Sequence, residues 1–258
     1  MKILIANDDG IQAIGIQTLA KALCKDHEVY IVAPDQERSA AGHALTLNTP
    51  IRVREVDLGI GIKKSWAISG TPGDCVKIGI NAILDVKPDL VISGINHGPN
   101  LGSDVLYSGT VSAAMEGAVL GYPSIAVSLA DLYGTSYDFK PAAQFMAEFL
   151  KKIHNINFPK KTILNINVPT GKIEDMKGVC IAKLGTKTYT DDYEKRFDPR
   201  GKVYYWMAGV PISDNHEKGT DMAAIMNNKI SITPVTFEMT HTDIMQDLEI
   251  VFATTTCD

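Results

Sequence analysis

Two adjacent acidic residues, Asp8 and Asp9, follow the first apolar run of the sequence in the segment Asn7-Asp8-Asp9-Gly10. Asn and Asp-Gly favour tight turns by themselves, so these four residues alone fit a structural turn as well as a ligand site. Their position favours the ligand site, because two carboxylates at the end of a buried parallel strand repel each other. A hard divalent cation would compensate that repulsion. Asp8 and Asp9 are therefore candidate metal ligands and candidate catalytic residues.

Oxygen-bearing side chains follow two further apolar runs. One run ends at Ala33, and the segment after it holds Ser39. The loop 93–102 follows another run and carries Asn96 and Asn100 among its glycines. Each segment also fits a plain loop. Together, carboxylate, amide and hydroxyl oxygens suit Mg²⁺ or Mn²⁺ better than zinc.

Ser108, Gly109 and Thr110 begin a predicted helix of small residues. The free N–H groups and the dipole of a helix start favour an anion. Simple N-capping would account for Ser108 without any ligand. It would not account for the coincidence of this helix start with three polar loops at the strand ends of one sheet. A divalent cation beside an anion-binding helix start is typical of phosphate chemistry.

Several familiar catalytic motifs are absent from the sequence. It has no G-x-x-x-x-G-K-[ST], no G-x-S-x-G, no H-E-x-x-H and no G-x-G-x-x-G behind a strand. The six histidines are scattered, so we expect surface or supporting residues rather than a histidine metal site or triad.

The elements that must position these residues are predicted from hydrophobic periodicity. Nearly continuous apolar runs predict strands of a parallel sheet covered on both faces: Lys2–Ala6, Val29–Ala33, Leu90–Ser93 and Ser124–Leu129. Amphipathic patterns predict helices at Gln12–Leu23, 71–84, Ser108–Leu120 and Lys140–Ile153. This alternation predicts a doubly wound α/β fold, whose ligands bind beyond the carboxyl ends of the strands.

The second half of the chain has a different pattern. Strands are predicted at Ile163–Val168 and Lys229–Thr236, separated by a polar stretch punctuated by glycine, 184–220. That stretch concentrates aromatic residues: Tyr189, Tyr193, Phe197, Tyr204, Tyr205 and Trp206. It predicts an extended hairpin that packs on a partner.

Composition excludes several classes of protein. The 258 residues allow one large domain or two small ones. A net charge of −5 argues against a polymeric nucleic-acid partner bound through global charge. No apolar run approaches the roughly 20 residues of a membrane helix, and the apolar N-terminal run is too short for a signal peptide. Four separated cysteines (Cys24, Cys75, Cys180 and Cys257) without a C-x-x-C pair indicate a cytoplasmic protein.

With these residues in view, the chain closely resembles the SurE family of survival-protein phosphatases, the metal-dependent 5'-nucleotidases. The resemblance covers nearly the whole chain. It is carried by NDDG (7–10), VAPD (32–35) with the following Ser39, SGTPGDCV (69–76), PDLVISGINHGPNLGSDVLYSGTVSAAMEG (88–117) and KISITPV (229–235).

The resemblance implies a Rossmann-like, mostly parallel α/β sheet with an extended C-terminal hairpin arm. The chain would then be one domain, 1–258, with a core of about 1–184 and 220–258 and an oligomerisation hairpin of about 185–219. One divalent cation per subunit is expected on four ligands, and the substrate phosphate on four further residues. The metal ligands are Asp8, Asp9, Ser39 and Asn96, and the phosphate contacts are Asn100, Ser108, Gly109 and Thr110. Homodimers or homotetramers would form through the hairpin.

The implied activity is hydrolysis of nucleoside 5'-monophosphates to nucleoside and phosphate, with 3'-nucleotides and short polyphosphate as further expected substrates. We expect an in-line displacement in which water is activated by the metal or by a carboxylate not fully committed to it, with Asp8 favoured. An aspartyl-phosphate intermediate is the less favoured route. Two other classes stay open: a nucleotide-binding regulator of the same fold without turnover, and a purely structural oligomer. The adjacent carboxylates argue against the structural oligomer, because they cost stability unless something binds them.

Overall fold

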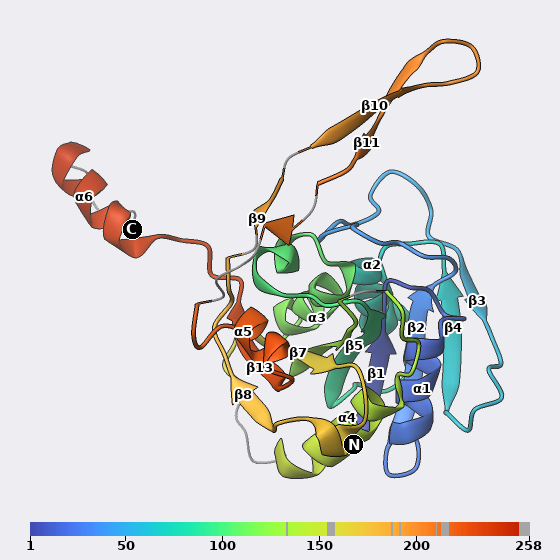
Figure 1. Ribbon diagram of the computed structural model, residues 1–258. Coiled ribbons are helices and arrows are strands. Elements are labelled where there is room, and N and C mark those ends of the chain that lie inside the picture. Colours follow the sequence, from blue (N-terminus) through green and yellow to red (C-terminus); the bar gives the residue numbers. More distant parts are fainter. Residues whose placement is uncertain are drawn as a thin grey trace.

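A nine-stranded sheet, in the order β3-β4-β2-β1-β5-β6-β7-β13-β8, organises the part of the chain that the computed structural model describes (Figure 1). The described residues are 1–132, 134–153, 158–186, 188–190, 192–209, 211–212 and 217–252. The strands of this sheet are β1 (Lys2–Ala6), β2 (Glu28–Pro34), β3 (Val53–Glu55), β4 (Lys64–Ile68), β5 (Leu90–His97), β6 (Ser124–Ala130), β7 (Thr162–Pro169), β8 (Val179–Ile181) and β13 (Ile230–Thr236).

The central strands are parallel and wind in two directions. From β1 the chain moves outward to β2 and β4, and it then returns to the other side of β1 to add β5, β6 and β7. The direction of winding therefore reverses between β1 and β5, which is where a doubly wound sheet binds its ligands. The edge strand β3 runs antiparallel to β4. Near the other edge, β13 runs antiparallel to β7 and pairs in parallel with the edge strand β8. The predicted mostly parallel, doubly wound fold is confirmed.

Helices cover both faces of the sheet. On one face, α1 (Ile14–Leu23) packs with α4 (Lys140–Lys152), and on the other α2 (Pro72–Ile78) packs with α3 (Gly109–Val119). Strand β1 alternates between the two layers: Ile3 and Ile5 belong to the core cluster under α1, whereas Leu4 belongs to the cluster under α2. Because both faces are covered, β1 has no polar face, as its continuous apolar run predicts.

The predicted helix boundaries lie within two residues of the observed ones, except at the end of α2. Thr71 caps α2 in a capping box with Asp74, as expected from the Thr-Pro start. The predicted helix 71–84 ends as an α-helix at Ile78 and continues as a π-helical turn, η1 (Gly79–Ile83). Helix α1 begins at Ile14, two residues after the predicted start.

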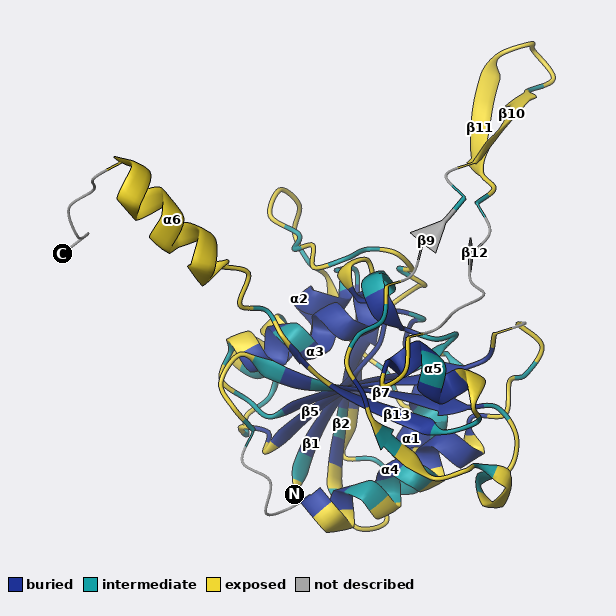
Figure 2. Ribbon diagram, turned by 60° about the vertical axis from the view of Figure 1, so that its left-hand side comes forward, coloured by how far each residue is buried: buried dark blue, intermediate teal, exposed yellow. Residues whose placement is uncertain are grey.

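The predicted hairpin arm is present. Strands β10 (Tyr193–Phe197) and β11 (Val203–Met207) pair antiparallel, as do β9 (Thr188–Tyr189) and β12 (Pro211–Ile212) at its base. The arm projects away from the sheet, and every residue of β10 and β11 is exposed (Figures 1 and 2).

Two helices near the C-terminus were not predicted. Helix α5 (Asp221–Met226) packs against β13, whereas α6 (Thr242–Phe252) has no buried residue and extends away from the sheet (Figure 2). Short turns of 3₁₀ helix occur at η2 (Gly102–Leu106) and η4 (Ile173–Asp175).

The remaining sequence expectations concern cysteines and membrane helices. Cys24, Cys75 and Cys180 are free, and Cys257 lies outside the described residues. Among the residues that the structure describes, no helix combines the length and the apolar character needed to span a bilayer.

Candidate active site

A cavity of about 530 Å³ opens at the carboxyl ends of β1 and β5. This volume lies within the range of small-molecule sites. Six of the predicted site residues line it: Asp8, Asp9, Ser39, Asn96, Asn100 and Ser108. The fold thus brings together residues from three separate strand ends and one helix start.

The buried carboxylate of Asp8 lies against the start of α3. Thr110 Oγ1 donates a hydrogen bond to Asp8 Oδ1, and the Thr110 backbone N–H also donates to this carboxylate. A Cβ atom at Gly109 would lie 2.8 Å from Asp8 Cβ and 2.9 Å from Asp8 Oδ2. Only glycine allows this approach, so the carboxylate and the helix start are packed together. Thr110, which was predicted as a phosphate contact, therefore holds the Asp8 carboxylate.

The electrostatics of the two carboxylates favour a bound cation. Burial, and then the charge of Asp8, raise the pKa of Asp9 from 3.8 to about 7. Burial likewise raises the pKa of Asp8, against the hydrogen bonds from Thr110. A neighbouring cation would favour the ionised forms that burial and mutual repulsion now disfavour.

Ser39 and Asn96 present oxygen atoms to the same cavity. The Ser39 hydroxyl donates to Glu37 Oε1 at 2.6 Å, which leaves the lone pairs of Oγ available. Asn96 Nδ2 donates to the Gly98 carbonyl oxygen at 2.9 Å, which leaves Asn96 Oδ1 available. Strand β5 extends through Asn96 after a bulge that begins at Ser93, whereas the sequence analysis ended the strand at Ser93.

Asn100 and Ser108 are held by partners that leave a donor for an anion. The backbone of Asn100 bonds to the side chains of Asn165 and Asn167, and its Nδ2 donates to Ser128 Oγ at 2.8 Å. One N–H of that amide group stays available. Ser108 caps α3 by accepting a hydrogen bond from the Val111 N–H, so its own O–H can donate to an oxyanion.

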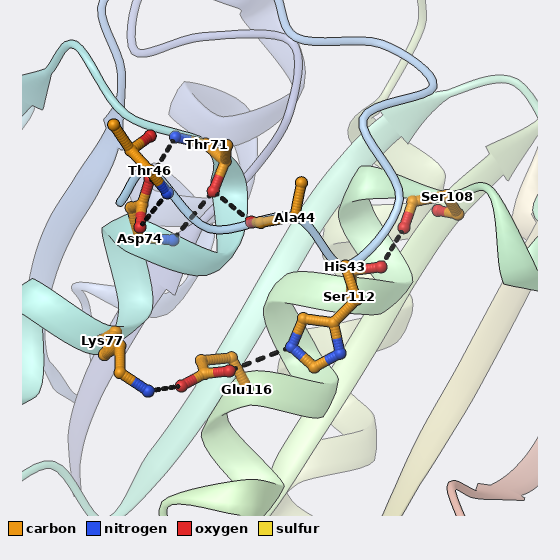
Figure 3. A network of polar contacts seen from close by, with 9 residues as sticks. All are labelled: His43, Ala44, Thr46, Thr71, Asp74, Lys77, Ser108, Ser112 and Glu116. Carbon is orange, nitrogen blue, oxygen red and sulfur yellow. Dashed lines mark hydrogen bonds and ion pairs between the residues drawn. The ribbon is translucent and has the colours of Figure 1, made fainter. Parts of the chain in front are cut away.

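A polar network anchors the loop that carries Ser39 (Figure 3). Buried Glu116 of α3 accepts hydrogen bonds from His43 Nε2 at 2.9 Å and Lys77 Nζ at 2.7 Å. Farther along the loop, the Ala44 carbonyl accepts a hydrogen bond from Thr71 Oγ1. The loop is therefore joined to both helices of one layer.

A second buried carboxylate ties the site to the base of the arm. Asp221 of α5 is fully buried and accepts hydrogen bonds from the backbone N–H groups of Gly102 and Gly185, each at 2.8 Å. Gly102 begins η2 beside the predicted phosphate residues, and Gly185 precedes β9. The sequence analysis did not identify Asp221, whose partners lie 36 and 119 residues away.

Other side chains of the cavity were also missed by the sequence analysis. They are Ile14, Glu37, His97, Asp104, Tyr107, Tyr137 and Phe139. Glu37 had a detectable signal, because it is a carboxylate two residues from a predicted ligand. The histidine expectation had treated His97 as a scattered residue, and no local pattern marks Tyr137 as part of a site.

The oxygen-donor set fits a hard cation. Among the described residues, no group of three or more His, Cys, Asp or Glu side chains could hold a metal. Two carboxylates, one hydroxyl and one amide oxygen form a different set, which suits Mg²⁺ or Mn²⁺. Next to the carboxylates, the buried Asn7 Oδ1 has no hydrogen-bond partner.

Comparison with known proteins identifies similar chains. A family model described as survival protein SurE matches residues 3–191. The 5'-nucleotidase SurE of Thermosynechococcus vestitus is 51% identical over 254 residues, covering 96% of this chain and 95% of that protein. The 5'-nucleotidase SurE of Pelotomaculum thermopropionicum is 51% identical over 253 residues, covering 96% and 94%. The crystal structure of the SurE protein from Aquifex aeolicus superposes with a TM-score of 0.85 at 39% identity, covering 98% of this chain and 100% of that one.

Proposed function

This chain belongs to the survival protein SurE family, and from that premise we propose that it is a metal-dependent phosphomonoesterase that hydrolyses nucleoside 5'-monophosphates to nucleoside and phosphate. The relatives named 5'-nucleotidase support the substrate class. The observation that carries the chemistry is the close packing of Asp8 against Gly109 and Thr110. It puts a carboxylate pair and a helix start within one cavity, where a phosphate ester would meet both.

Asp8, Asp9, Ser39 and Asn96 would hold one Mg²⁺ or Mn²⁺ per subunit. When bound, the cation would polarise a phosphoryl oxygen and neutralise part of its charge. The raised pKa of Asp9 supports this assignment, because the ionised pair needs a positive charge to be stable.

The chain's own residues would bind and orient the phosphate. Asn100, Ser108 and Gly109 would contact its oxygen atoms through amide, hydroxyl and backbone donors. Such preorganised donors stabilise the charge that develops in the transition state, which is usually the largest catalytic term. Thr110, predicted as a further phosphate contact, would act through Asp8, because its hydroxyl and its backbone N–H both donate to that carboxylate. Asp8 would accept the proton of the attacking water, because it lines the cavity and Thr110 fixes the orientation of its carboxylate.

A phosphate-release panel tests this function. AMP, GMP, CMP and UMP, with 3'-AMP and tripolyphosphate, are incubated with the protein in Mg²⁺, Mn²⁺ or EDTA. We expect release from the 5'-monophosphates with either metal and none in EDTA. The 3'-nucleotide and the polyphosphate test the wider substrate range that we also propose. AMP binding without phosphate release would contradict the proposal and indicate a regulatory nucleotide-binding protein.

The Asp9→Asn variant tests the metal scheme in the same phosphate-release assay. It keeps the size and one oxygen of the side chain but removes a charge. Turnover should fall by on the order of 10²-fold or more, together with metal affinity. Full activity of Asp9→Asn in chelator-treated buffer would rule the metal scheme out.

We also propose that the arm of about 185–219 joins a core of about 1–184 and 220–258 into homodimers or homotetramers. Exposed aromatic side chains on the arm support this, among them Tyr193 at 61%, Phe197 at 62% and Trp206 at 59% exposure. A cytoplasmic location is proposed as well, since the cysteines of the described residues are unpaired.

A further inference from the structure

The cavity has a second wall that the phosphate chemistry does not use. Ile14, His97, Tyr137 and Phe139 line it beside the oxygen-bearing side chains. Two of these residues are well exposed, Ile14 at 60% and Tyr137 at 63%. An exposed aromatic ring on a concave surface, close to converging polar groups, is typical of a ligand site.

A polar network joins the segment 134–139, which carries Tyr137, to Asp131 and His97. Asp131 Oδ2 accepts a hydrogen bond from the Ser136 N–H at 2.6 Å and lies 3.5 Å from His97 Nε2. His97 Nε2 in turn donates to the Ser136 carbonyl oxygen at 3.1 Å. The segment 134–139 is therefore held against His97 by contacts within the chain.

The aromatic rings form a layered wall. The rings of His97 and Tyr137 are stacked, with centroids 4.4 Å apart and planes 25° apart. Phe139 meets the His97 ring edge-on at 6.1 Å. His97 covers one face of the Tyr137 ring, and the exposure of Tyr137 leaves its other face available to a planar ligand. Nucleobases stack on such rings with little dependence on their identity.

His97 also connects this wall to the carboxylate end of the cavity. Its backbone N–H donates a hydrogen bond to the Asp9 carboxylate, while its ring stacks on Tyr137. One residue thus contacts both a predicted metal ligand and the aromatic wall. A ligand with an anionic group at one end and a flat ring at the other would match these two ends.

We propose that Tyr137, backed by His97 and accompanied by Ile14, forms a stacking subsite for the base of a nucleoside monophosphate. The subsite rests on the proposed function for its phosphate end. Within that function, Tyr137 is the residue that would distinguish a nucleotide from other small phosphate esters.

Two substrates separate the contribution of the base to kcat/KM from that of the phosphate. AMP has both groups, whereas ribose 5-phosphate keeps the ester and the sugar but lacks the base. Replacement of Tyr137 by Ala should lower kcat/KM for AMP about tenfold and leave kcat/KM for ribose 5-phosphate unchanged, since stacking acts only on the base. Tyr137→Phe keeps the ring and should restore the value for AMP.

Tyr107 supplies a matched contrast, because it lines the same cavity and is 68% exposed, next to Ser108. If Tyr107→Ala, rather than Tyr137→Ala, shows the loss that is selective for AMP, the proposed subsite is wrong. Equal losses with both substrates in Tyr137→Ala would indicate only a supporting role for the segment 134–139 and would also overturn it. If Tyr137→Ala loses activity with neither substrate, the proposed subsite is also wrong.

Calorimetric binding in EDTA distinguishes this proposal from the hydrolase proposal. Wild type should bind AMP about tenfold more tightly than ribose 5-phosphate, and Tyr137→Ala should remove the difference. That binding result, together with no phosphate release from AMP in Mg²⁺ or Mn²⁺, would retain the subsite and refute the hydrolase. Equal affinities of wild type for the two compounds would refute the subsite, whatever the turnover.

Discussion

The carboxylate end of the sheet and the hairpin arm differ in how their side chains are held. In the cavity, Asp8 is fixed by Thr110, and Asn100 by partners on β6 and β7. On the arm, β10 and β11 pair with each other, and all of their residues are exposed, including Tyr204 and Trp206. Internal partners fix the geometry of the site within this chain. The arm instead presents apolar surface whose burial would require another molecule.

After the effect of Asp9→Asn on turnover, the largest effect is expected from the close approach of Gly109 to Asp8. Replacing Gly109 by Ala puts a Cβ 2.8 Å from Asp8 Cβ, so the carboxylate must move away from α3. A displacement of this size should lower phosphate release at least about tenfold, because catalysis depends on sub-ångström placement. Activity is measured with AMP and Mn²⁺, and circular dichroism reports the fold.

Gly73→Ala is the matched control for that variant. Gly73 also lies in the first turn of a helix, α2, but a Cβ there would have its nearest neighbours at 3.5 Å, an ordinary contact. This variant should keep its activity within about twofold. Equal behaviour of the two variants would show that the contact between Asp8 and α3 does not set the site geometry.

A smaller effect is expected on the stability of the metal-free chain. The pKa of Asp9 is about 7 in the folded state against 3.8 in the unfolded state. Between these pH values the folded chain keeps a proton that the unfolded chain has released. The Asp9 contribution to the free energy of unfolding therefore falls as pH rises from about 4 to about 7, by at most about 4 kcal/mol, and then stays constant.

Thermal melting in EDTA across this pH range checks that sign. Wild type should lose melting temperature relative to Asp9→Asn as pH rises, and Mn²⁺ should reverse the loss by stabilising both ionised carboxylates. Parallel pH profiles for wild type and Asp9→Asn would contradict the assigned pKa shift.

The smallest effect on the site is expected from the arm. Replacing 193–207 by a short Gly-Ser turn removes β10 and β11 but leaves the cavity intact. The mass measured by light scattering should fall, while phosphate release per subunit stays within about twofold, because distant regions act independently. Removal of α6 provides the comparison, since this helix is also exposed. Retention of the native mass after the arm is removed would show that the arm does not mediate assembly.

Much of the fold and of the site was predictable, because local patterns encode it. Continuous apolar runs identified the central strands, and the Thr71-Pro72 pair identified the start of α2. Six of the eight predicted site residues line one cavity, because parallel strands place their carboxyl ends at one edge of a sheet, whereas Gly109 and Thr110 pack against Asp8. Short elements such as β3 and α5 were missed, since a few residues carry too little periodicity.

The sequence by itself determined the alternation of strands and helices in the core, the oxygen-rich strand ends and the aromatic character of the arm. Only the tertiary structure decided that Tyr137 stacks on His97, that Glu116 anchors the loop after β2, and that Asp221 joins η2 to the base of the arm. The physical reason is the separation along the sequence of the residues that interact. Periodicity and capping arise between residues a few positions apart, whereas these contacts join distant segments whose meeting depends on how whole helices and strands pack.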